Sequence, residues 1–262
     1  MNYYNLRVYY YEHGTQYRIY SRPIVKQSEH EKEVNKNKKI NTGIIPDALK
    51  NERTQEEIER SNSVSLNRSK QNLIGICRAN KWDYFITFTF NPRLVDSSNY
   101  EEVCRKAGRF MNNLKKRYCP YMKYILVPEL HKDGEHYHLH GLISDCQGMQ
   151  LQVSGKTDRK GKIIYNIPSW RYGWNTATEV THSGKASYYI AKYIIKDTEG
   201  LIKGKRRYWC SRNVFYPRDV CDELYIKNYK TVIEQLAQNE AIKHIKKRHI
   251  YTCNRDIFYI ET

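Results

Sequence analysis

The sequence predicts an α+β protein with a small antiparallel sheet and helices packed on one face of that sheet. From Tyr84 onwards the pattern runs strand, helix, strand, strand, and then a further strand and helix, an order typical of this class. Hydrophobic residues make up 40% of the 262 residues and aromatic residues 13%. This content predicts a folded chain with a sizeable core rather than a disordered one.

Each expected element follows from a local pattern. Residues 3–20 alternate around a His13-Gly14 turn and predict a hairpin. Residues 26–65 are polar and rich in lysine, and we expect a linker there that leads into a basic helix over 53–80. The strand expected at 84–90 ends before Pro92, since proline cannot donate to a strand ladder. The remaining expected elements are strands at 124–127, 137–143 and 176–180, helices at 101–117, 186–195 and 231–245, and hairpins within 145–168 and at Asn254-Arg255.

The charge balance indicates a polyanionic partner. Lysine and arginine total 45 against 28 aspartate and glutamate, a formal net charge of +17, and such an excess repels itself unless an anion offsets it. The 24 tyrosines offer flat faces on which the bases of a single strand can stack. A basic protein encoded by an AT-rich genome would show the same composition, so composition alone leaves both interpretations open.

Two classes of protein are disfavoured. The seven cysteines are scattered without a C-x-x-C pair, which fits a reducing cytosol and argues against a disulfide framework or a cysteine zinc site. No run of 18 apolar residues and no secretory signal occurs. We therefore expect an intracellular protein without a membrane partner.

The segment HYHLHGLI at 136–143 holds the first candidate site. Residues two apart on a strand point to the same side, so that His136, His138 and His140 can share a face. The last two form a tight pair of nitrogen ligands for a divalent metal, and Gly141 would let a ligand or backbone approach closely. A single H-x-H pair is weak support, because histidines on a strand face are usually ordinary core or surface residues.

A carboxylate completes this candidate site. Glu129 ends the preceding strand, and a hairpin through Asp133-Gly134 would bring it beside His138 and His140. A carboxylate with two imidazoles suits Mg²⁺ or Mn²⁺ when phosphate and water fill the remaining positions. Taken by itself, Glu129 would be an ordinary surface carboxylate.

The segment SYYIAKYIIK at 187–196 holds the second candidate site. Tyr189 and Tyr193 are four residues apart and so lie on one face of a helix, and Lys192 follows Tyr189 by three. A nearby ammonium and a metal-bound phosphate would favour attack by the phenolate. Tyrosines at helical spacing are more often part of a core, but Ile190 and Ile194 already supply an apolar stripe here.

Three motifs, taken together, resemble those of the HUH endonucleases, in particular the rolling-circle replication initiators of small single-stranded DNA phages and related plasmids. The motifs occur in the expected order and are FITFTFNP at 85–92, Glu129 with HLHG at 138–141, and YIAKY at 189–193. Two further segments are similar to that group, WRYGW at 170–174 and RYWCSRN at 207–213. The resemblance implies a ferredoxin-like or RRM-like HUH core over 68–212, flanked by an N-terminal hairpin and basic linker at 1–67 and a C-terminal helical and hairpin extension at 213–262.

The resemblance also implies roles for single residues. His138, His140 and Glu129 would bind Mg²⁺ or Mn²⁺, while the FITFTF strand would be structural. Tyr189 would attack a phosphate of single-stranded origin DNA and form a 5′-phosphotyrosine link, and Tyr193 would be a second nucleophile. A final role falls to Lys192, which would position the phosphate. A bacterial cytoplasm and a host DNA polymerase and helicase as partners are implied as well.

Three alternatives remain at this point. A transposase or relaxase of a mobile element would use the same chemistry, although the paired tyrosines favour an initiator. A non-catalytic single-stranded DNA or origin-binding protein would need only charge and tyrosines, and not Glu129, His138 and Tyr189 together. An initiator with its own motor is disfavoured, because Gly155-Lys156-Thr157 lacks the preceding glycine of a phosphate loop, having Gln150 instead.

Overall fold

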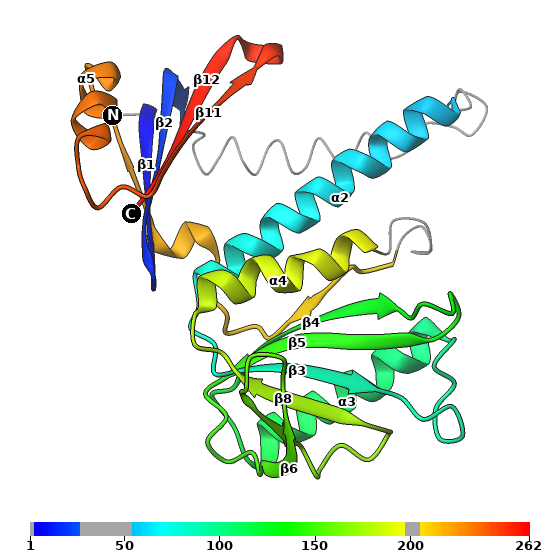
Figure 1. Cartoon of the computed structure of the whole chain (residues 1–262). Coiled ribbons are helices and arrows are strands. Elements are labelled where there is room, and N and C mark those ends of the chain that lie inside the picture. The colour runs from blue at the N-terminus through cyan, green and yellow to red at the C-terminus, as the bar shows by residue number, and fades with distance from the viewer. Residues whose placement is uncertain (1–2, 27–53, 197–204) are drawn as a thin grey trace. The chain divides into compact units, whose positions relative to one another are not determined.

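The computed structural model describes residues 3–26, 54–196 and 205–262, and for residues 194–196 the backbone only. The chain divides into two compact units, here called the first unit (1–62 with 218–262) and the second unit (63–217) (Figure 1). Both are α+β with antiparallel sheets, so that the predicted fold class is confirmed. Most of the expected lysine-rich linker, residues 27–53, lies outside the described residues.

The second unit is built on a seven-stranded antiparallel sheet, larger than the sheet that we expected. In spatial order its strands are β6 (Gln152–Thr157), β7 (Ile163–Asn166), β8 (Asn175–Glu179), β3 (Tyr84–Thr89), β5 (Tyr137–Ser144), β4 (Lys123–Leu130) and β9 (Trp209–Cys210). The hairpin expected within 145–168 is β6–β7. The central strands β3, β5 and β4 carry the motif residues, and each is a continuous β-rich run whose two faces are both covered.

Helices cover both faces of this sheet, and the expectation of helices on one face only is wrong. Helix α3 (Tyr100–Arg117) buries Val103, Phe110 and Leu114 on one face, in the core that contains Phe88 and Leu139. On the other face, apolar residues of helices α2 (Gln55–Arg78) and α4 (Ser183–Lys196) pack against residues of β4 and β5 (Figure 1). Because alternate residues of a strand point to opposite faces, each central strand has two buried sides.

Local signals explain where α3 begins and ends. The side chain of Asn99 accepts hydrogen bonds from the backbone N–H groups of Glu101 and Glu102, which caps the first turn. Acidic residues in that turn and basic residues in the last turn complement the helix dipole.

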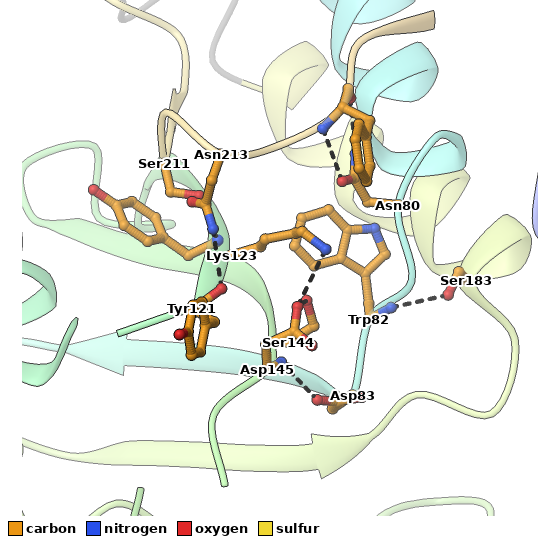
Figure 2. A network of polar contacts seen from close by, with 12 residues as sticks. Asn80, Trp82, Asp83, Tyr121, Lys123, Ser144, Asp145, Ser183, Ser211 and Asn213 are labelled. Atoms are coloured by element: carbon orange, nitrogen blue, oxygen red, sulfur yellow. Dashed lines mark hydrogen bonds and ion pairs between the residues drawn. The ribbon is translucent and has the colours of Figure 1, made fainter. Parts of the chain in front are cut away.

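Polar contacts attach the segment after β9 to the second unit (Figure 2). Asn80 accepts a hydrogen bond from the Phe215 backbone N–H at 2.9 Å and donates to the Phe215 carbonyl at 2.8 Å. Asn213 donates to the Tyr121 carbonyl at 3.0 Å. The compact second unit therefore continues past residue 212.

Strands from both ends of the chain form the sheet of the first unit. Its spatial order is β10 (Cys221–Leu224), β1 (Tyr3–Tyr11), β2 (Gly14–Val25), β12 (Arg255–Glu261) and β11 (His244–Ile250). Helix α5 (Tyr229–Ala237) packs on the face formed by Leu6, Val8, Ile19 and Ile260. The hairpin predicted over 3–20 is β1–β2, and the one at Asn254-Arg255 is β11–β12.

One local expectation fails in the first unit. We expected a helix over 231–245, but α5 ends at Ala237 and residues 244–250 form β11. This strand lies at the edge of the sheet, where its consecutive basic residues suit an exposed, unpaired side. Among the helices that the structure describes, none is both long enough and apolar enough to cross a bilayer.

Candidate active site

The central strands bring the predicted ligand residues to one face of the sheet. Glu129 lies directly opposite His138, and His140 lies opposite Val127 on the same pair of strands. Residues opposite each other in an antiparallel pair share a face, so that Glu129, His138 and His140 all project toward the α4 side. The hairpin between β4 and β5 produces this arrangement, as the sequence predicted.

Two threonines of β3 contact the two imidazoles. Thr87 pairs with His140 and Thr89 with His138 in the strand register. The Thr87 hydroxyl lies 3.1 Å from His140 Nδ1, and the Thr89 hydroxyl lies 3.3 Å from His138 Nδ1. Both contacts use Nδ1, so each ring is oriented with its Nε2 edge directed away from β3. Sequence reasoning missed these residues, although their alternation in FITFTF matches that of the histidines.

His140 and Glu129 form the closest polar pair of the site. His140 Nε2 lies 2.6 Å from Glu129 Oε2, and both side chains are largely buried. This short contact shows that the carboxylate and the imidazole converge on one point. His138 Nε2, in contrast, makes no hydrogen bond to any of the described residues.

Burial keeps His138 in its neutral form. Desolvation lowers the pKa of His138 below its ordinary value of 6.5, and the neighbouring imidazoles of His131 and His140 lower it further. Neutral imidazole is the form that binds metal ions. The His131 ring, which sequence reasoning did not single out, stacks on His138 with centroids 4.7 Å apart.

The turn between β4 and β5 is organised by a separate carboxylate. Asp133 accepts hydrogen bonds from the backbone N–H groups of Glu135 and His136, and these hold the pKa of its carboxyl well below the usual range. Its other oxygen lies 3.0 Å from His136 Nδ1 and 3.1 Å from His131 Nδ1. His136 therefore belongs to the turn rather than to the group formed by His138 and His140.

Helix α4 presents Tyr193 directly over this group. The Tyr193 ring stacks on the His140 ring with centroids 3.7 Å apart and planes 17° apart. It is only 8% exposed. Burial, followed by the Tyr189 hydroxyl and Glu129, raises the pKa of the Tyr193 phenol far above its ordinary value. This phenol therefore stays protonated at neutral pH.

Tyr189 lies one turn earlier on the same face of α4 and is accessible. Its side chain is 48% exposed, and its hydroxyl accepts a hydrogen bond of 2.9 Å from the Tyr193 hydroxyl. Its ring packs edge-on against Phe85 with centroids 5.1 Å apart. Lys192 Nζ lies 5.7 Å from the centre of the Tyr189 ring. Tyr188, the neighbouring exposed tyrosine, makes none of these contacts.

Gly141 has a different role from the one that the sequence indicated. We expected it to admit a ligand or backbone beside the histidines, but it points to the opposite face. A Cβ atom there would lie 2.7 Å from the Ile125 carbonyl oxygen and from a methyl group of Leu126, and 3.0 Å from the Ile86 side chain. The glycine is therefore required for packing in the core of the sheet.

The donor set fits a divalent cation in its chemistry. Two imidazoles and one carboxylate project from one face, one imidazole is neutral by burial, and the carboxylate already meets the other. In the metal-free geometry of the described residues, however, no three His, Cys, Asp or Glu side chains converge closely enough to hold a metal ion together. A cation would have to draw His138 Nε2 toward the pair formed by Glu129 and His140.

A comparison with protein families now connects this geometry to a known group. Residues 83–198 match the family model for the replication-associated protein ORF2. The matched segment begins just before β3 and includes all six of the predicted site residues. The resemblance to replication initiators is confirmed at the level of this family. The comparisons with curated proteins and with solved structures gave no match.

Proposed function

We propose that this protein is a replication initiator that nicks and rejoins single-stranded DNA at an origin, by way of a 5′-phosphotyrosine intermediate and with the help of Mg²⁺ or Mn²⁺. The observation that carries the proposal is the contact of Tyr193 with both halves of the site. Its ring stacks on His140 at 3.7 Å, and its hydroxyl donates to Tyr189 at 2.9 Å. An accessible phenol is thereby held next to a cluster of ligands suited to a cation that binds phosphate.

His138, His140 and Glu129 would hold the cation. When bound, it would neutralise charge that gathers on the phosphoryl oxygens during the reaction. The chain supplies further positive charge near the nucleophile through Lys192, whose ammonium lies beside the Tyr189 ring. The net charge of +17 supports DNA as the partner.

Tyr189 is the better first nucleophile of the two tyrosines. It is about half exposed, whereas Tyr193 is buried and its pKa is raised. The Tyr189 oxygen would bond to phosphorus as the bond from phosphorus to the 3′ oxygen breaks. The phenolic proton that Tyr189 loses is balanced by the proton that the 3′ oxygen gains. Tyr193 fixes the Tyr189 hydroxyl during this step, because it donates a hydrogen bond to it.

Storage of the broken bond as a tyrosine ester permits rejoining without ATP, since the 3′ hydroxyl can attack the ester in the reverse reaction. The free 3′ hydroxyl is also the group that a host polymerase extends. A host helicase would supply unwinding, because no phosphate-loop motif is found in the sequence.

Formation of a covalent adduct tests the proposal. The protein is incubated with labelled single-stranded origin DNA and Mn²⁺, and adducts are separated on a denaturing gel. Tyr189→Phe should abolish the adduct, and Tyr188→Phe is the matched control that should leave it unchanged. Tyr193→Phe should slow adduct formation by about 2- to 13-fold, the effect of one neutral hydrogen bond. A normal adduct in the double variant Tyr189→Phe/Tyr193→Phe would refute the catalytic assignment.

A non-catalytic binding protein is the second candidate. Its supporting observation is that no three ligand side chains converge among the described residues. It predicts metal-independent binding of single strands and no adduct in any variant.

A further inference from the structure

The row of residues that contains His138 continues across the sheet to an exposed tryptophan. Trp174 lies just before β8, and its carbonyl accepts a hydrogen bond of 2.8 Å from the Thr89 backbone N–H. The register of β3 with β8 pairs Phe88 with Asn175, so that Trp174 lies opposite Thr89. Thr89 in turn lies opposite His138, and His138 lies opposite Glu129.

The side chain of Trp174 therefore lies on the same face as the candidate active site. Residues directly opposite each other on antiparallel strands share a face. On β8 the alternate residue Ala177 belongs to the core on the α3 side, which places Trp174 on the other side, with Thr89 and His138. Its side chain is 73% exposed.

The WRYGW segment divides its two tryptophans between the two faces. Trp170 is 3% exposed and stacks on Phe88 in the α3 core, with centroids 4.1 Å apart. That contact explains one tryptophan as part of the core. Trp174 makes no ring or cation contact with the described residues, and packing does not explain it.

The backbone holds Trp174 in place although its side chain is free of the core. Thr89 and Asn91 donate backbone hydrogen bonds to the carbonyls of Trp174 and Tyr172, both at 2.8 Å. Gly173 between them has φ +153°, and a Cβ atom there would collide with the Thr89 carbonyl and lie 2.7 Å from the Asn91 nitrogen. Only glycine permits so close an approach to β3. The indole is thus carried on a rigid backbone, as a preformed binding surface requires.

Isolated exposed apolar side chains are common on proteins, so exposure alone identifies no site. Here exposure is combined with a fixed backbone and with a place in the row of Thr89, His138 and Glu129. From these observations we propose that Trp174 is a stacking platform for a nucleobase of the single strand, next to the phosphate that is cut. This inference rests on the proposed function, since it takes single-stranded DNA as the ligand of this face.

The chemistry of the platform determines what it recognises. Every base has an aromatic face, so that a tryptophan binds single strands with little regard to sequence. A duplex keeps its bases stacked on one another and would not offer one to Trp174. The platform would therefore favour melted over paired DNA and would set the direction in which the strand crosses the sheet.

A double comparison of protein and DNA tests the inference without requiring cleavage. The affinity of the full chain is measured by fluorescence anisotropy, without metal, for an oligo-dT strand of about 16 nucleotides and for an abasic strand of the same length. Trp174→Ala should weaken binding to oligo-dT by about 5- to 150-fold, the value of one stacked base. Binding to the abasic strand, which keeps only the phosphate contacts, should not change.

Two variants separate stacking from a structural effect. Trp174→Phe keeps a flat ring and should restore most of the affinity for oligo-dT. Tyr121→Ala removes an aromatic side chain that is 78% exposed and precedes the far end of β4, and it should leave both affinities unchanged. Equal losses for both strands in Trp174→Ala, or no loss for either, would overturn the inference.

The outcome for the proposed function is read separately. If Trp174→Ala binds oligo-dT normally while the wild type still forms the tyrosine adduct, the platform is wrong and the nickase stands. If the wild type binds neither strand and forms no adduct, both proposals fail. If the stacking pattern is found without an adduct, the platform stands on a protein that binds but does not cut.

Discussion

The contact between Thr87 and His140 allows the proposed metal site to be tested through a residue that would not touch the cation. Thr87→Val replaces the hydroxyl by a methyl group of similar size in the middle of β3. His140 is 9% exposed, and the Thr87 hydroxyl at 3.1 Å is the partner of its Nδ1. The substitution therefore leaves a buried polar atom without that partner and loosens the orientation of the ring.

The magnitude follows from two independent estimates. An unpaired buried polar atom costs about 1–3 kcal/mol, which corresponds to about 5- to 150-fold in an equilibrium constant. Loss of the group that orients a ligand usually weakens metal binding by about 10- to 100-fold. We therefore expect the Mn²⁺ concentration at half-maximal adduct formation to rise by about 10-fold or more, with a rate at saturating Mn²⁺ close to that of the wild type.

Two controls make the measurement specific to the contact. Thr87→Ser keeps the hydroxyl and should bind Mn²⁺ nearly as the wild type does. Thr176→Val makes the same change on β8 directly opposite Thr87, at an exposed position without a hydrogen bond among the described residues, and should have no effect. An unchanged Mn²⁺ requirement in Thr87→Val, measured by adduct formation and by calorimetric titration, would refute the assignment of His140 as an oriented ligand.

Three further predictions concern stability. Gly141→Ala should lower the free energy of unfolding in urea by about 1–3 kcal/mol through overpacking, since its Cβ would lie 2.7 Å from the Ile125 carbonyl oxygen; an unchanged midpoint would contradict this packing role. Gly173→Ala should cost more, because a strained φ of +153° is added to a clash with the Thr89 carbonyl. Because the folded-state pKa of His138 lies below 6.5, the unfolded chain binds the extra proton as pH falls below 6.5, and stability declines in that range. His138→Asn should flatten this decline in urea titrations at several pH values, and an equally steep decline would show that other groups cause it.

The candidate site could be predicted as far as local patterns reach. Alternation placed His138 and His140 on one face, and the short hairpin placed Glu129 beside them. Helical spacing placed Tyr189 and Tyr193 on one side of α4, where they are joined by a hydrogen bond. Each of these inferences involves residues within about a dozen positions of one another, for which strand or helix geometry fixes the neighbours.

Pairing between distant segments could not be predicted. The contacts of Thr87 and Thr89 with the imidazoles depend on the register of β3 against β5, which lie about 50 residues apart. The sheet of the first unit likewise pairs Tyr17 with Ile260, from opposite ends of the chain. Sequence reasoning treated these terminal segments separately, because neither segment indicates its partner. The helix expected over 231–245 failed for a related reason, since β11 is a strand only by virtue of its pairing with β12.

The choice of threonine as the partner of each imidazole has a physical consequence that a carbonyl would not have. A hydroxyl both donates and accepts, and it rotates to suit its partner. When His140 Nε2–H donates to Glu129, Nδ1 carries no proton and the Thr87 hydroxyl donates to it. When the Nε2 lone pair is turned to a cation, the proton lies on Nδ1 and the same hydroxyl accepts it. Thr87 can therefore hold the ring in one orientation through either tautomer, and a valine can do so in neither.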